Sequence, residues 1–149
     1  MIRPAKAADL EQVLTLLKNF AGQSLINYNE WTEEDLKNAR KVLLNLILKE
    51  YLMVAERDGL LVGMIGAQRE QDPWIHSRRR LRELFWWVEP EHRRTKLSAE
   101  LFIRWQKDTE RMLKDKLVDQ VSLSTQPSKS DIDLSTRGWT CVESHWIKE

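Results

Sequence analysis

Residues 84–88 place the strongest limit on how this chain can fold. Their order, Leu-Phe-Trp-Trp-Val, is apolar at every position, so both faces of an extended segment would be hydrophobic. Such a strand needs cover on both sides, which is typical of the centre of a sheet. We predict a strand from about Arg80 to Glu89, ended by Pro90, and a helix from Thr95 to Leu117 soon after it.

The other segments have the periodicity of helices or strands. Asp9 and Gln12 are spaced as a helix-capping pair, and Thr32 precedes three acidic residues as an N-cap does. On the long helix, Glu100–Arg104 and Glu110–Lys114 have the i,i+4 spacing of ion pairs. The remaining predicted elements are a strand at Ile2–Pro4, helices from Asp9 to Gly22 and from Thr32 to Glu50, a hairpin of Leu52–Glu56 and Leu60–Gln68, a strand at Asp119–Thr125, a short helix at Ser128–Thr136, and one or two strands within Trp139–Lys148.

This order predicts an α+β fold in which a central, mixed but mostly antiparallel sheet is flanked by about four helices. The 149 residues contain no repeat and no interior linker, so we expect a single domain over residues 1–149.

Composition excludes several classes of function. Lys and Arg number 24 against 23 Asp and Glu, which argues against a nucleic-acid coat. Cys141 is the only cysteine and the three histidines lack metal-ligand spacing, so we expect no metal site. There is no signal peptide and no membrane-spanning run, which predicts a cytoplasmic protein without a membrane partner. Arg78–Arg80 with Arg82 could face an acidic substrate or nucleic acid, or form a solvated entry to a strand.

Three segments resemble the GCN5-related N-acetyltransferase (GNAT) family. Ile2–Ala5 followed by Asp9–Glu11 is similar to the family's opening, and Val88–Leu101 is similar to its central strand–loop–helix motif. Arg137–Trp139 followed by Val142–Ser144 is similar to its closing segment. The last two segments are most similar to small bacteriophage-encoded members. The resemblance implies a GNAT-like fold, acetyl-CoA as cosubstrate and the possibility of a homodimer.

The central motif implies where acetyl-CoA would bind. A helix that begins soon after a strand offers free backbone N–H groups to phosphate oxygens. In the family this turn binds the pyrophosphate, and the preceding strand lies beside the pantetheine arm. The family's two glycines are replaced here by Lys96 and Ser98, while the neighbouring cations add charge suited to a polyphosphate. The implied cofactor-binding residues are Trp87, Val88, Arg93, Arg94, Thr95, Lys96, Leu97 and Ser98.

The resemblance also suggests catalytic residues. Glu83 lies where some members keep a glutamate that takes the amine proton, although its distance from Val88 is one residue short, so a β-bulge would matter. Its alternative role is a strand-end carboxylate paired with Arg79, Arg80 or Arg82. The family's usual tyrosine acid is replaced by Leu134, and Ser124 or Thr125 could substitute for it.

Three functions remain open at this stage. The first is transfer of an acetyl group from acetyl-CoA to an amine of a small molecule or protein. The second is a catalytically inactive protein on the same fold that binds a host or partner macromolecule, which the replacements at Lys96, Ser98 and Leu134 favour. The third is nucleic-acid binding through Arg78–Arg82.

Overall fold

The computed structural model describes residues 1–23, 30–125, 133–143, 146 and 148. Its strands are β1 (Ile2–Pro4), β2 (Tyr51–Arg57), β3 (Leu60–Gln71), β4 (Arg79–Val88) and β5 (Gln120–Ser122), and its α-helices are α1 (Leu10–Gln23), α2 (Glu33–Lys49) and α3 (Lys96–Lys114). The strands form one sheet in the order β1-β2-β3-β4-β5. All neighbours are antiparallel except β4 and β5, which are parallel. The prediction of a mixed, mostly antiparallel sheet in an α+β fold is confirmed.

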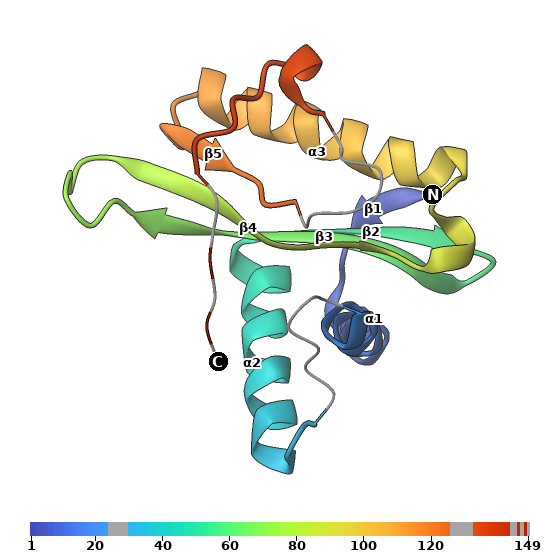
Figure 1. The fold of residues 1–149 in the computed structure, drawn as a ribbon. Helices are drawn as coiled ribbons and strands as arrows, with labels where there is room; N and C mark the ends of the chain where they lie inside the picture. The colour runs from blue at the N-terminus through green and yellow to red at the C-terminus, as the bar shows by residue number, and fades with distance from the viewer. Residues whose placement is uncertain (24–29, 126–132, 144–145, 147, 149) are drawn as a thin grey trace.

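Helices cover both faces of the sheet, as the apolar run at residues 84–88 requires. Helices α1 and α2 lie on one face and α3 lies on the other (Figure 1). Phe85 and Trp87 of β4 pack in the core cluster with α1 and α2, whereas Val88 packs in the cluster with α3. Trp105 of α3 is fully buried and meets Tyr51 of β2 edge to face, with 5.1 Å between ring centroids.

The first helical segment starts differently from the prediction. A 3-10 turn, Ala7–Asp9, precedes α1, and the Asp9 carboxylate accepts the backbone N–H of Lys6 at 2.7 Å. Gln12 does not cap this helix, because its side-chain oxygen accepts the backbone N–H of Leu61 at 2.9 Å. The predicted Asp9–Gln12 capping pair is therefore wrong.

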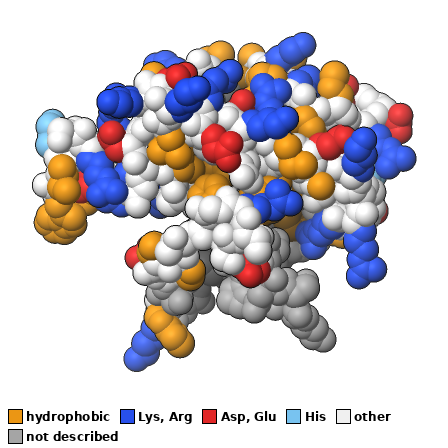
Figure 2. Space-filling model, turned by 90° about the horizontal axis from the view of Figure 1, so that it is seen from above, with side chains coloured by type: hydrophobic (Ala, Val, Ile, Leu, Met, Phe, Trp, Pro, Cys, Tyr) orange, Lys and Arg blue, Asp and Glu red, His pale blue; other side chains and the backbone are white. Residues whose placement is uncertain are grey.

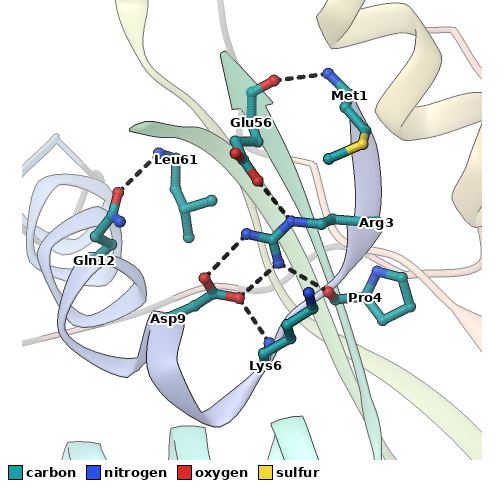
Figure 3. A network of polar contacts seen from close by, with 8 residues as sticks. All are labelled: Met1, Arg3, Pro4, Lys6, Asp9, Gln12, Glu56 and Leu61. Carbon is teal, nitrogen blue, oxygen red and sulfur yellow. Dashed lines mark hydrogen bonds and ion pairs between the residues drawn. The ribbon is translucent and has the colours of Figure 1, made fainter. Parts of the chain in front are cut away.

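Arg3 organises the surroundings of that turn (Figure 3). Its guanidinium donates to both oxygens of Asp9, at 2.7 and 3.0 Å, and to Glu56 of β2 at 2.6 Å. Asp9 is 7% exposed, and its hydrogen bonds with Arg3 hold the pKa of its carboxyl below the usual value. These contacts join β1 and β2 to the turn that leads into α1.

The second helix starts as predicted. The Thr32 hydroxyl accepts the backbone N–H of Asp35 at 3.1 Å, and the Asp35 carboxylate accepts the backbone N–H of Thr32 at 2.8 Å. This reciprocal capping box satisfies two backbone donors at the helix start.

Ion pairs on α3 differ from the two predicted ones. Lys96 pairs with Glu100 at 3.4 Å, and Arg104 pairs with Asp108 at 2.8 Å. Asp108 attracts Arg104 because it is a buried carboxylate, which also accepts the Tyr51 hydroxyl at 3.0 Å. The charge of the buried Asp108 is screened less by solvent than that of the partly exposed Glu100, so Arg104 is attracted to it more strongly.

The C-terminal region forms less regular structure than the sequence suggests. Most of the predicted helix at Ser128–Thr136 lies outside the described residues, and Ser135–Arg137 forms a 3-10 turn ended by Gly138 with φ of 83°. We expected about four helices; the described residues contain three α-helices and three 3-10 turns. None of the described residues after Gly138 belongs to a strand, and Trp146 is 94% exposed. The strand preference of apolar and β-branched residues depends on packing against neighbouring strands, so their presence in this segment does not by itself produce a strand.

Candidate functional site

A β-bulge in β4 shapes the centre of the candidate site. Gly66 of β3 lies opposite Phe85, but the next residue, Ala67, lies opposite Glu83. Leu84 is therefore the extra residue in β4. β4 thus has a bulge between Glu83 and Val88, the stretch in which the sequence indicated that a bulge would matter.

Glu83 is a buried carboxyl group with one hydrogen-bond partner among the residues that the structure describes. It is 8% exposed, and its Oε2 accepts the backbone N–H of Ser124 at 3.1 Å. Burial raises its pKa to about 7, although the Ser124 hydrogen bond and the charge of Arg82 act in the opposite direction. A carboxyl with this pKa exchanges a proton readily near neutral pH, which is what a general base requires.

The alternative pairing of Glu83 with a nearby arginine is wrong. Arg79 pairs with Asp119, Arg80 with Asp72 and Arg82 with Glu70, so each guanidinium has another carboxylate.

On the face of the molecule covered by α3, basic side chains are interspersed with acidic ones (Figure 2).

The outer edge of β4 opens directly beside Glu83. Strand β5 pairs only with Arg80–Arg82, so beyond Arg82 this edge faces no strand of the described chain. Glu89 donates its backbone N–H to Val62 on the β3 side. Because backbone groups alternate in direction along a strand, those of Val88 and Trp86 point to the open edge. This edge can hydrogen-bond an extended ligand that carries amide groups.

The helix start after β4 offers a second recognition element. Thr95 is the N-cap residue of α3, yet its hydroxyl donates to the carbonyl of His92 at 2.7 Å and makes no capping hydrogen bond to the helix. Arg94 is exposed, and the Lys96 side chain is 88% exposed. Free N–H groups, the helix dipole and these two cations suit an anion such as a phosphate. Ser98 and Leu97 are half-buried in the same turn.

The Arg93 side chain does not point to solvent beside Arg94 and Lys96 but contacts β4. Its Nε donates to the carbonyl of Val88 at 2.9 Å, and its guanidinium carbon lies 4.4 Å from the centroid of the Trp87 ring. The sequence indicated a basic residue here but gave no signal of the contact with Trp87, because the contact depends on which face of β4 the side chain meets.

Ser124 meets Glu83 through its main chain, and its side chain is exposed at the end of the segment after β5. Leu134, at the position of the family's tyrosine, packs against the core cluster of α3. In the described ranges there is no group of His, Cys, Asp and Glu that could hold a metal ion. None of the helices described is long and apolar enough to cross a bilayer.

The parallel strands β4 and β5 pair only up to Arg82, next to the buried Glu83, and α3 begins soon after β4 and connects the two strands. This arrangement defines the class of fold with which the chain is compared. The sequence profile of the acetyltransferase (GNAT) family matches residues 14–123, and the chain belongs to this family. Members of the family use acetyl-CoA. Among curated proteins, no sequence matches the chain.

Solved structures agree on the fold. A possible acetyltransferase from Clostridium difficile 630 is 20% identical, with a TM-score of 0.67, and the match covers 100% of this chain and 96% of that one. A transcriptional regulator from Bacillus halodurans C-125 is 18% identical, with a TM-score of 0.70 and coverage of 100% and 98%. A predicted acetyltransferase with acetyl-CoA from Clostridium acetobutylicum is 13% identical, with a TM-score of 0.62 and coverage of 91% and 97%. At these identities the likeness shows the fold alone.

Proposed function

We propose that this protein is an acetyl-CoA-dependent N-acetyltransferase that acts on an amine of a small molecule or a protein. The observation that carries the proposal is Glu83: a buried carboxyl with a pKa near 7, placed by a β-bulge beside the open edge of β4. Family membership supplies the reaction class, and this carboxyl supplies a proton acceptor for the amine. We further propose that residues 1–149 act as one domain, in the cytoplasm and without a membrane partner.

The residues of β4 and of the α3 start fit acetyl-CoA. The backbone groups of Trp86 and Val88 at the open edge would hydrogen-bond the pantetheine arm. The side chain of Trp87, the residue between them, packs on the face of the sheet covered by α1 and α2. The backbone N–H groups of Lys96 and Leu97, with the Arg94 and Lys96 side chains, would hold the phosphates, whereas those of Thr95 and Ser98 donate to the carbonyls of His92 and Thr95. The electrostatic attraction between the cations and the phosphates does not depend on the family's glycines. However, the side chains of Lys96 and Ser98 at those positions limit how closely the backbone can approach the phosphates.

Acetyl-CoA, when bound, supplies an acetyl group already activated as a thioester. The Glu83 carboxylate accepts a proton from the acceptor ammonium, so that the amine nitrogen can attack the thioester carbonyl carbon. As the carbon–sulfur bond breaks, the departing thiolate would take a proton from the exposed Ser124 hydroxyl, our proposed donor, which would be reprotonated by the second proton that leaves the attacking nitrogen as the amide forms. The remaining rate enhancement would come from positioning the two reactants.

The test begins with calorimetric titration of the full chain with acetyl-CoA. We expect binding in the micromolar range, weakened about tenfold or more in the Arg94→Gln, Lys96→Gln double variant, since each cation faces a multiply charged ligand. Lys41→Gln removes one positive charge from the exposed side of α2, away from the α3 start, and should leave affinity unchanged. No binding at millimolar acetyl-CoA would refute the proposal.

A catalytically inactive binding protein is the second proposal. Lys96 and Ser98 at the glycine positions and Leu134 at the tyrosine position favour it. Acetyl-CoA binding without turnover of a broad panel of amines, peptides and proteins would support this reading over the enzyme. Nucleic-acid binding through Arg78–Arg82 has less support, because three of these arginines already pair with carboxylates. Kinship with bacteriophage-encoded members and formation of a homodimer stay predictions.

A further inference from the structure

Arg93 connects the turn before α3 to strand β4 and helix α1. Its Nε–H donates to the Val88 carbonyl at the end of β4, and its Nη2 lies 3.4 Å from the side-chain oxygen of Gln23 at the end of α1. Its guanidinium stacks over the Trp87 ring at 4.4 Å from the centroid. Three directional contacts therefore fix one side chain between β4 and α1, even though Arg93 is exposed.

These contacts draw the charge of Arg93 away from the α3 start. Trp87 packs in the core cluster of α1 and α2, on the face of the sheet opposite α3. Arg94 and Lys96 make no comparable contacts with the residues that the structure describes: both are exposed, and Lys96 forms a surface pair with Glu100 at 3.4 Å. To reach a phosphate at the α3 start, Arg93 would have to give up the ring of Trp87 and the carbonyl of Val88.

The carbonyl that Arg93 contacts belongs to the proposed cofactor site. Val88 directs its backbone groups to the open edge of β4, where the pantetheine arm would bind. Arg93 also contributes to the orientation of the Trp87 side chain by stacking on its ring. This side chain is 7% exposed, and its indole Nε1 has no hydrogen-bond partner in the part of the chain that the structure describes. Arg93 thus fixes both the orientation of the last edge carbonyl and the side chain next to it.

We propose that Arg93 is a positioning residue that fixes the end of β4 for the thioester arm, and that it does not bind the phosphates. The proposal rests on the proposed function, since it concerns the same acetyl-CoA site. It assigns the phosphate contacts to Arg94, Lys96 and the backbone alone.

Arg93→Lys separates the two roles. Lysine keeps the positive charge that a phosphate needs, but it has no Nε–H at that position and no planar group to stack on Trp87. Two ligands are compared. Acetyl-CoA has a pyrophosphate and the pantetheine arm, whereas ADP has a pyrophosphate and no arm. We expect Arg93→Lys to weaken acetyl-CoA about tenfold, the cost of one lost charge-assisted hydrogen bond, and to leave ADP within about twofold.

Arg94→Gln is the control and should weaken both ligands. Equal weakening of ADP and acetyl-CoA by Arg93→Gln, with full rescue by Arg93→Lys, would show that Arg93 binds phosphate and would overturn the inference alone. Failure of the unsubstituted protein to bind either ligand would instead overturn the proposed function, and the inference with it.

A ligand-free measurement checks the contact itself. The indole N–H resonance of Trp87, assigned by its loss in Trp87→Phe, should shift in Arg93→Lys because the guanidinium no longer covers the ring. The same resonance should not move in Arg94→Lys. An unchanged resonance in Arg93→Lys would contradict the proposal even if the variant folds normally.

Discussion

Glu83 combines two properties that oppose one another in an ordinary folded protein. Burial makes ionisation of a carboxyl group costly, and stable cores therefore seldom contain one without a cation beside it. Here the neighbouring arginines pair with other carboxylates, and within the described ranges of the chain Glu83 has a single backbone hydrogen bond. The cost is consistent with a functional role, because a proton acceptor near pH 7 requires a carboxyl whose pKa is raised.

The first prediction concerns the pH dependence of activity. Because Glu83 must be ionised to accept a proton, kcat/KM should rise about tenfold per pH unit below pH 7 and level off above its pKa of about 7. Glu83→Gln should lower kcat/KM at pH 8 by about 100-fold and remove that dependence. Initial rates from pH 5.5 to 9 test this, with Glu110→Gln on the exposed side of α3 as control. A Glu83→Gln profile that keeps the same inflection would contradict the assignment.

The second prediction concerns stability. The pKa of Glu83 is raised from 4.5 to about 7 in the folded protein, so its neutral form is favoured by folding. The contribution of Glu83 to the free energy of unfolding is fully present below about pH 4.5 and is lost as pH rises through 7. The total loss is about 3 kcal/mol. Glu83→Gln cannot ionise, so it should lose less stability than the unsubstituted protein between pH 5 and pH 8.5. Urea unfolding at the two pH values measures the difference, and parallel losses in both proteins would count against a buried Glu83.

At the scale of single elements, the bulge in β4 depends on a glycine in its neighbour. A Cβ atom at Gly66 would lie 2.4 Å from Cζ of Phe85, whose ring is buried. The partner strand can therefore accept Phe85 only because residue 66 lacks a side chain.

The third prediction follows from that contact. Gly66→Ala should destabilise the fold by about 1–3 kcal/mol, the usual cost of overpacking, and should lower kcat because β4 must move beside Glu83. Gly59→Ala provides a comparison: Gly59 has a φ of 79° but open space around its Cβ position, so it should cost about 1 kcal/mol without affecting kcat. Denaturant melts and steady-state rates of both variants test this, and a Gly66→Ala protein with normal stability would argue against the register at Phe85.

The elements differ in how well the sequence predicted them. Residues 84–88 predicted a buried central strand because apolar character on both faces has a single structural explanation, and Thr32 predicted a capping box because the motif is local. Asp9 was misassigned because Arg3, six residues earlier, competes for its carboxylate. The spacing of Glu83 indicated that a bulge would matter, but Ser124, the partner of its carboxylate in the described part of the chain, lies 41 residues further along, so no local pattern could reveal it.

At the scale of the whole molecule, the proposed chemistry lies at the β4–β5 end of the sheet, whereas the Arg3 contacts lie at the β1–β2 end (Figure 3). Arg3 reaches Asp9 at the entry to α1 and Glu56 in β2, so a single guanidinium joins the sheet to one helical layer. Stability and the candidate site can therefore be altered separately.

The fourth prediction uses that separation. Arg3→Ala leaves the Asp9 carboxylate buried without its main cation, and Asp9→Ala removes the acceptor, so each should cost about 1–3 kcal/mol. Because both remove the same contact, the double variant should cost less than the sum of the two by about 1 kcal/mol or more. The contribution of Asp9 is present above its unfolded pKa of about 4 and lost as pH falls through its lowered folded pKa, so the coupling should shrink in acid. Urea unfolding of the four proteins at pH 7 and pH 3 measures this, and purely additive costs at pH 7 would show that Arg3 does not join the two layers.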